Sequence, residues 1–460
     1  MSEIGQRREP RLAAGSTSLK TLPGEVTNPS VAELAVTVVI GAFWLILVDI
    51  PRQIQFGPMT LSGAITILTA ALTLCCLPSY AINSAVRSRL LGRADQARLR
   101  IPWPLWGFVL FVSVSFIINK SGRISSESIQ NVCVYLSFVG AIAFAATIES
   151  KALVLRGWSL MRKLSVWFAY LALGTSVAAS GAGLADDRLL AFLYTPRSMA
   201  IVGLIALAMV IPGKAGNIWT KCAPVALVAA MALTLSRSST AIGLALLVFV
   251  VLRGKRRSQG KPGGRLFKAI AILSGVGLTA YCLFIFYAPF RDRFLNDHDA
   301  VSVGGVSIGT EGRATVWKLM LSNASDHWLF GHGAGSASEL IMLHFPGRGL
   351  DHPHNEYIRF YFDFGIIGLS LFVVGYLTLI WRVFRNARQS DHPLHWSALI
   401  ALVGVGLVAI TDNPFVYPFV LVPLGSLAGL SLALARFELG YRSSPAQGRL
   451  VGDSSAIIRE

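Results

Sequence analysis

The chain has 460 residues, of which 53% are hydrophobic and only 14% are charged. Soluble domains usually carry about a quarter of their residues as Asp, Glu, Lys and Arg, so this composition excludes an ordinary water-soluble protein and predicts a polytopic membrane protein. The net charge of +17 does not indicate a nucleic-acid partner, because the cations lie in short clusters between apolar runs rather than on one water-facing patch.

The apolar runs, taken in chain order, predict an all-α fold with about 12 transmembrane helices. We expect a disordered cytoplasmic tail over 1–30, nine helices over 31–288, three more over 356–436 and a second cytoplasmic tail over 437–460. The runs lie near 33–50, 60–79, 101–118, 131–148, 164–181, 198–211, 222–236, 240–252, 269–288, 358–381, 396–411 and 415–436.

The positions of Lys and Arg predict the orientation, because cytoplasmic loops carry an excess of both residues. With the N-terminus in the cytoplasm, 29 of the 41 Lys and Arg residues fall on the cytoplasmic side and 12 on the other. Both termini are therefore predicted to be cytoplasmic.

One outward segment, 289–355, is much longer than the other connections and is predicted to form a large, partly helical periplasmic loop. Loops of this length are usually functional. A short helix is expected over Arg313–Leu321, and a second after a capping box formed by Ser336 and Glu339. The loop holds six of the eight histidines, so we expect any chemistry on this side. The face expected to be apolar in the first short helix comprises Ala314, Trp317 and Leu321.

The densest polar cluster, 351–359, ends this loop and opens the tenth predicted helix. Pro353 fits the first turn of a helix, with His352 or Asp351 as the capping residue. The side chains that would then project into a cavity of the loop are His354, Asn355 and Arg359.

Two interpretations of these histidines stay open from the residues alone. His354 can take a proton from a hydroxyl at neutral pH, or it can only cap the helix or hydrogen-bond at the membrane interface. His352 and His354 with Asp351 could also bind a metal, but no third ligand follows at a diagnostic spacing, so we expect none.

Arg237 lies between apolar runs of only 15 and 13 residues, which are too short to cross a hydrocarbon core of about 30 Å unless they tilt. An arginine below the membrane surface is expected to face a polar cavity or an anion; the alternative is an arginine that snorkels to the interface. Arg197 begins another short run on the same side and could line the same site. Arg313 begins the first short helix of the loop, where an ordinary exposed arginine is the alternative.

Two further signals are weak. The stretch Gly331–Ser336 is rich in glycine but lacks the lysine of a phosphate-binding loop, so we interpret it as a turn that permits close packing. The triplet Asp412-Asn413-Pro414 is interpreted as the end of a helix.

Several short motifs, in this order and with this loop placement, resemble one family. They are Leu235-Ser236-Arg237, Gly312-Arg313 with Trp317, and His354-Asn355 followed by Phe364–Leu369. Together, over about residues 220–380, they are similar to the O-antigen ligase and polymerase superfamily of bacterial inner-membrane proteins.

The resemblance implies a lipid-donor glycosyltransferase of surface-polysaccharide assembly, for lipopolysaccharide or exopolysaccharide. Such enzymes move a glycan from undecaprenyl diphosphate to an acceptor glycan or lipid A-core on the periplasmic face, without a nucleotide, a cofactor or a metal. It implies that His354 is the general base and that Arg237 and Arg313 hold the diphosphate, with Arg197 as a looser match. The supporting positions would be Asn355, His352, Glu356 and Arg359.

Three alternatives follow from the same residues. A ligase and a polymerase share the donor chemistry and differ only in the acceptor. A transporter or flippase of a lipid-linked glycan would spread its charges along a full path across the membrane, whereas here the unusual charges gather at one end. A non-catalytic assembly scaffold would tolerate alanine at Arg237 and His354.

Overall fold

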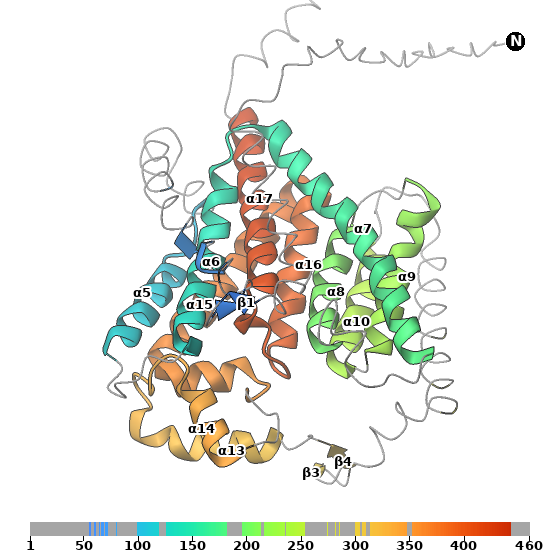
Figure 1. Ribbon diagram of the computed structural model, residues 1–460. Coiled ribbons are helices and arrows are strands. Elements are labelled where there is room, and N and C mark those ends of the chain that lie inside the picture. The colour runs from blue at the N-terminus through green and yellow to red at the C-terminus, as the bar shows by residue number, and fades with distance from the viewer. Residues whose placement is uncertain are drawn as a thin grey trace, which may run out of the picture.

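The computed structural model of the chain describes residues 99–118, 126–181, 196–212, 216–234, 236–253, 300–303, 306–309, 313–346 and 352–442, together with 55–56, 59–60 and isolated positions in 64–80 and 274–285. Over these ranges the fold is built of helices, with two short antiparallel strand pairs, as Figure 1 shows. The predicted all-helical class is therefore confirmed. The expected helix near 33–50, most of those near 60–79 and 269–288, and most of both tails lie outside the described residues.

The elements have the following bounds. The bundle contains α5 (Trp103–Ile118), α6 (Ser126–Thr147), α7 (Lys151–Gly181), α8 (Pro196–Val210), α9 (Ile218–Leu233), α10 (Arg237–Arg253), α15 (Glu356–Ser390), α16 (Pro393–Val408), the 3-10 turn η3 (Pro414–Val416) and α17 (Pro418–Arg442). The remaining elements are β1 (Gln55–Phe56), β2 (Met59–Thr60), β3 (Ala300–Val303), β4 (Val306–Gly309), α13 (Arg313–Asn323), the 3-10 turn η2 (Ser325–His327) and α14 (Ser336–His344).

Three helical segments in the described part of the chain are long and apolar enough to cross a membrane, namely Ser128–Thr147, Glu356–Ser390 and Pro418–Leu439. Five more helices are apolar but shorter. Large apolar side chains such as Ile117 on α5 and Leu377 on α15 are more than half exposed, as expected for side chains that face lipid. These features support a membrane protein, while the count of about 12 spans and the orientation stay predictions.

α7 is longer than its predicted apolar run, 164–181. α7 begins at Lys151 and has 31 residues, so it includes most of 149–163, which was expected to be a cytoplasmic loop. An apolar run identifies only the part of a helix that lies in lipid or in the protein core, so it does not include polar turns at the ends of the helix. Most residues in the preceding turns of α7 are good helix formers, namely Lys, Ala, Leu, Met and Arg.

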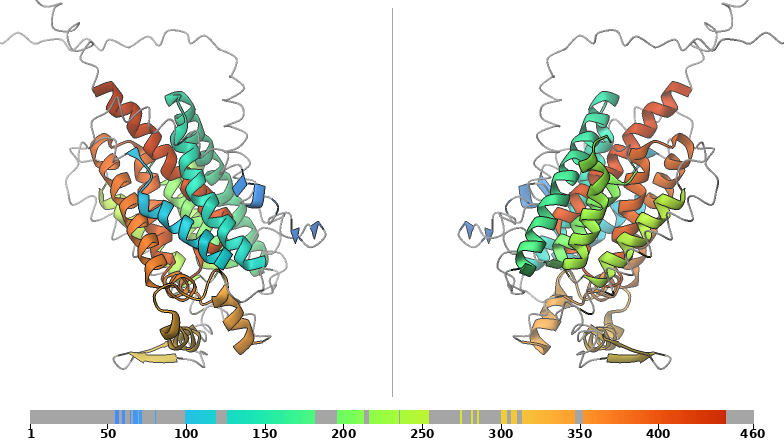
Figure 2. Two further views of the ribbon diagram at one scale, coloured as in Figure 1. Left: turned by 90° about the vertical axis from the view of Figure 1, so that its left-hand side faces the viewer. Right: turned by 90° about the vertical axis from the view of Figure 1, so that its right-hand side faces the viewer.

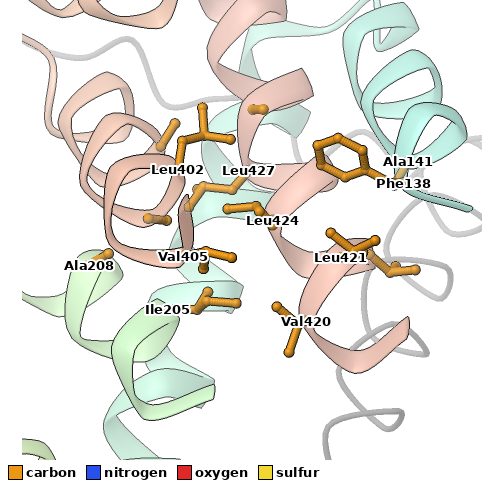
Figure 3. Close-up of a cluster of buried hydrophobic side chains, with 14 of the residues drawn as sticks. Phe138, Ala141, Ile205, Ala208, Leu402, Val405, Val420, Leu421, Leu424 and Leu427 are labelled. Atoms are coloured by element: carbon orange, nitrogen blue, oxygen red, sulfur yellow. The ribbon is translucent and has the colours of Figure 1, made fainter. Parts of the chain in front are cut away.

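The core lies around α17, which packs against α6, α16 and α8 (Figure 3). Two glycines four residues apart, Gly425 and Gly429, bring α17 close to α6, because a Cβ on Gly429 would lie 2.4 Å from the Ile142 carbonyl oxygen. Small residues at this spacing are typical of helices that pack in membranes. Arg436, near the end of α17, donates to the Ala146 and Ile148 carbonyls and so closes the C-terminal end of α6.

A small second core joins α13 and α14 to the start of α15, at one end of the bundle in Figures 1 and 2. The predicted helix at Arg313 is confirmed, but its predicted face is wrong: Val316 and Met320 are buried against Phe362, while Leu321 is 50% exposed. These two positions are one turn apart, so they meet the neighbouring helix together.

The predicted capping box of α14 is also wrong. Gly335, in a left-handed conformation, occupies the N-cap position without a side-chain hydrogen bond. The Ser336 hydroxyl donates to the His332 carbonyl instead, because the tight turn before α14 brings that carbonyl within reach.

Candidate functional site

α15 is broken at Gly365, and a loop that precedes α14 lies against the break. Gly365 has φ 63° and ψ −169°, so α15 consists of two helical segments joined at a kink. The Ile366 N–H donates to the Trp328 carbonyl at 2.8 Å. The 328–333 loop is thereby tied to the backbone that the break exposes.

The glycine-rich stretch is confirmed as a turn that permits close packing. Gly331 has φ 73°, and a Cβ there would lie 2.4 Å from the Asp363 carbonyl oxygen. The Gly333 N–H donates to that same oxygen at 2.8 Å, and the Ala337 N–H donates to the Asp363 carboxylate at 2.8 Å. The loop and α14 are therefore positioned by the first segment of α15.

His332 lies in this loop with its ring stacked on Phe362, with the centroids 4.3 Å apart and the planes 6° from parallel. Burial lowers the pKa of His332, and the hydrogen bond to the Phe362 carbonyl opposes this only in part. The neighbouring His327 ring, 4.6 Å away, lowers the pKa further. The structure thus favours a neutral imidazole at His332.

α15 begins at Glu356, and its N-terminal cap differs from the predicted one. Asn355 is the N-cap, and its side-chain oxygen accepts from Tyr357 N–H at 3.0 Å and Ile358 N–H at 3.1 Å. The predictions that Pro353 lies in the first turn and that Asn355 projects into a cavity are therefore wrong. Asn is among the residues most preferred as an N-cap, and here its side-chain oxygen satisfies two N–H groups of the first turn.

His354 precedes the cap in a left-handed conformation with φ 52°. Its Nδ1 lies 3.4 Å from Asp412 Oδ1 and 3.3 Å from Asn413 Nδ2. The side chains of His354 and Asp412 are only 15% and 7% exposed. The two neighbours favour opposite tautomers, because Asn413 Nδ2 can only donate to Nδ1 and the Asp412 carboxylate can only accept from it. Hydrogen bonds to charged groups are the stronger ones, so the carboxylate favours the proton on Nδ1 and leaves the lone pair on Nε2.

The contribution of Asp412 and Asn413 was missed in the sequence, where they were interpreted as the end of a helix. That part of the interpretation fits their place just after α16, but it omits the contact with a residue 58 positions earlier. A polar pair between two long apolar runs was the available signal.

Arg313 joins the same place from α13. Its Nη1 donates to the Thr411 carbonyl at 3.1 Å, one residue before Asp412. Its neighbour on α13, Trp317, donates from Nε1 to the Pro353 carbonyl at 2.6 Å, one residue before His354. α13 therefore contacts both chain segments that meet here. We call His354, Arg313, Asp412 and Asn413 the His354 cluster.

His352, another predicted site residue, contacts α14. Its Nδ1 lies 3.2 Å from the Ser338 hydroxyl oxygen, and the ring is partly exposed. Ser338 is buried, so this contact links the approach to α15 with α14 rather than with Asp412. His352 therefore helps to fold the site.

Arg359 does not project into the loop as predicted. It is 2% exposed and bonds inside the bundle, where its Nε donates to Glu356 Oε2 at 2.6 Å. Its two terminal nitrogens donate to Asn131 Oδ1 at 3.2 Å and to the Tyr135 hydroxyl at 2.5 Å. The prediction was wrong because the residue one turn after Glu356 faces inward, toward α6.

Aromatic side chains of α5, α15 and η3 pack against one another close in sequence to the His354 cluster. The Phe360 ring stacks on Phe415, with 6.0 Å between centroids, and makes an edge contact with Phe372 at 4.5 Å. Phe108 of α5 contacts both Phe360 and Phe372. These contacts join both segments of α15 to Phe415, which follows Asn413 by two residues.

The other two predicted arginines lie on different helices. Arg237 is the first residue of α10 and is partly buried, and Arg197 is the second residue of α8. Both α8 and α10 pack against α16, whose end leads into Asp412. The structure thus brings Arg313 to the backbone carbonyl next to Asp412. It places Arg237 and Arg197 at the start of two helices that pack against α16.

Comparison with known proteins identifies one match. A family model described as O-antigen ligase matches residues 222–373, about a third of the chain. No curated protein matches. The matched range includes Arg237, Arg313 and His354 but not Asp412. It confirms the resemblance stated above over residues 222–373.

Proposed function

We propose that the chain transfers a glycan from undecaprenyl diphosphate to an acceptor hydroxyl on the periplasmic face of the inner membrane. The acceptor is a growing glycan in a polymerase or lipid A-core in a ligase. The observation that carries the proposal is the pairing of His354 with Asp412 beside Arg313. A base, a carboxylate that orients it and a cation thus lie close together, with His354 and Arg313 inside the region matched by the family model and Asp412 outside it.

His354 is the general base of this proposal. Its Nε2 removes the proton from the acceptor hydroxyl, while Asp412 holds Nδ1 and stabilises the imidazolium that forms. The separation of 3.4 Å is long for a hydrogen bond, but catalytic contacts often shorten only when the substrate is bound. A new bond forms between the hydroxyl oxygen and the anomeric carbon, and the attack from the face opposite the diphosphate inverts that carbon.

The arginines act on the leaving group. The bond between the anomeric carbon and the diphosphate oxygen breaks, and the electron pair leaves with the diphosphate. Guanidinium groups bind phosphate oxygens through two parallel hydrogen bonds, so Arg313 and Arg237 supply the charge that a metal supplies in other enzymes. Arg197 is a secondary candidate for the same role.

Transfer by purified protein tests the proposal, with glycans on undecaprenyl diphosphate extracted from the host as the donor. His354→Ala is expected to lower the rate by about 10²–10⁴-fold, the usual contribution of a general base. Arg313→Ala and Arg237→Ala should also lower it. His344→Ala and Arg388→Ala are matched controls, because both side chains are exposed and lie away from the His354 cluster. Wild-type rates in the His354 and arginine variants would refute the assignment.

Two further readouts separate the alternatives. Transfer in detergent supports an enzyme, whereas a flippase needs a sealed vesicle to produce a signal. In a deletion strain that carries His354→Ala, single repeat units on the final acceptor indicate a polymerase. Long chains that accumulate on the carrier lipid indicate a ligase.

A further inference from the structure

Glu356 and Arg359 form a buried ion pair that none of the steps above uses. Glu356 is fully buried, Arg359 is 2% exposed, and the Glu356 Oε2 to Arg359 Nη2 distance is 2.5 Å. Such a pair gives little net stability, because the cost of removing two charges from water offsets their attraction. A buried ion pair can instead fix one arrangement of the segments around it. The contacts of Glu356 indicate which segments these are.

Glu356 bonds both ends of the turn that carries Asp412, which we call the 409–416 turn. Its backbone N–H donates to the Ala409 carbonyl at 2.9 Å. Its Oε1 accepts from the Phe415 N–H, also at 2.9 Å. Asp412 lies midway between these two anchors, and His354 lies only two residues before Glu356.

Arg359 fixes Glu356 in turn. It holds the other carboxylate oxygen, Oε2, with two nitrogens, and its remaining contacts reach Asn131 and Tyr135 on α6. Both α6 partners are 2% exposed. The same end of α6 also touches the loop before α14, where the Ser128 hydroxyl donates to the Ala334 carbonyl at 2.5 Å.

We infer that the Glu356–Arg359 pair is a positioning device that sets the distance between Asp412 and His354, with α6 as its fixed support. This inference rests on the proposed function for its effect on the reaction rate, but not for its effect on the 409–416 turn. Neither residue needs to touch substrate. The effect is therefore expected on kcat, with the KM for the lipid donor unchanged.

The double variant Glu356→Gln/Arg359→Met tests the inference. It removes both charges, so it avoids the uncompensated buried ion that a single substitution would leave and that could prevent folding. The control is Glu438→Gln. Glu438 lies near the end of α17, away from the cluster, and its carboxylate contacts His395 of α16. Both proteins are studied as the full chain in lipid nanodiscs.

Amide hydrogen exchange gives the first result and needs no activity. Residues 409–417 should exchange at least tenfold faster in the double variant than in the wild type, while α8 and α9 keep their protection. Unchanged exchange in 409–417 would overturn the inference, as would an equal increase throughout the bundle, which indicates a general loss of stability.

Kinetics give the second result through a double-mutant cycle. The double variant should lose at least tenfold in kcat, but less than twofold when it is added to Asp412→Ala, because the pair acts through Asp412. A full, additive loss in the Asp412→Ala background would overturn the inference. If the wild-type protein transfers no glycan at all, the proposed function fails, and the exchange result still decides whether the pair holds the turn.

Discussion

Replacement of Gly365 by Ala tests whether the kink in α15 is a required feature of the fold. At φ 63° and ψ −169°, Gly365 occupies a region of backbone conformation that is essentially open only to glycine. Another residue there costs of order 1–3 kcal/mol. The new Cβ would also lie 2.3 Å from the Leu329 carbonyl oxygen and 2.6 Å from the Phe330 nitrogen.

The loop must therefore move by about 1 Å to reach an ordinary van der Waals distance. That movement breaks the bonds from Ile366 N–H to the Trp328 carbonyl (2.8 Å) and from Ile367 N–H to the Leu329 carbonyl (3.3 Å). Each is worth about 0.5–1.5 kcal/mol. With the backbone term, Gly365→Ala should destabilise the protein by about 2–6 kcal/mol.

Thermal unfolding in detergent measures the loss, and hydrogen exchange over 328–335 locates it. Gly174→Ala is the matched control: it lies within α7 with nothing within 4 Å of its Cβ position, so alanine should be neutral or stabilise by up to about 1 kcal/mol. Gly331→Ala should resemble Gly365→Ala, and the two together should cost less than their sum because they displace the same segment. A Gly365→Ala protein that melts like the wild type, with full protection over 328–335, would refute the reasoning.

Two further predictions concern the same end of the molecule. Trp317→Phe removes the bond to the Pro353 carbonyl and should cost about 0.5–1.5 kcal/mol, with a lower transfer rate because Pro353 adjoins His354; thermal unfolding and the transfer assay measure both effects, and a wild-type value of each would contradict the prediction. Because burial lowers the pKa of His332, protonation favours the unfolded chain, so the stability of the 328–336 segment is complete above the unfolded value of about 6.5 and declines as the pH falls through the lowered pKa. Hydrogen exchange at pH 7.5 and 5.5, corrected for the intrinsic rate, should show this loss, and His332→Phe should remove it; a loss of equal size in His332→Phe would assign it to another group.

Apolar runs in the sequence predicted the positions of the described bundle helices to within a few residues, apart from the polar extensions of α7 and α15. The apolar residues that determine which part of a helix is buried are numerous and lie close together in the chain. The ends were less predictable, because polar turns continue a helix beyond the apolar part. The cap of α15 shows this: Pro353 led to a predicted cap at His352 or Asp351, three or four residues before the observed cap, Asn355.

The site was predictable where its residues carry a local pattern and not where it depends on distant pairing. Arg313 and His354 both contact the segment 411–412, Arg313 at the Thr411 carbonyl and His354 at the Asp412 carboxylate. Asp412 was missed because its partner lies 58 positions away, and no periodicity connects the two. Arg359 was assigned to the wrong surroundings because its buried partners, Asn131 and Tyr135, belong to another helix.

The kink at Gly365 explains how one helix serves both the bundle and the His354 cluster. The segment Ile366–Ser390, at 1.5 Å per residue, is about 37 Å long and can cross a hydrocarbon core of about 30 Å without help. The first segment of α15 is therefore not needed for crossing. The hydrogen bonds of two tyrosines show where the first segment lies. Tyr357 donates to the Gly406 carbonyl, and Tyr376 donates to the Leu402 carbonyl.

These two carbonyls are one turn apart on α16. In an unbroken helix Tyr357 and Tyr376, which are 19 residues apart, would be separated by about 28 Å and could not both reach them. The first segment must fold back toward the end of α16, and this carries His354 to Asp412. Gly365, 11 positions after His354, thus decides whether base and carboxylate meet, so Gly365→Ala should impair transfer as well as stability.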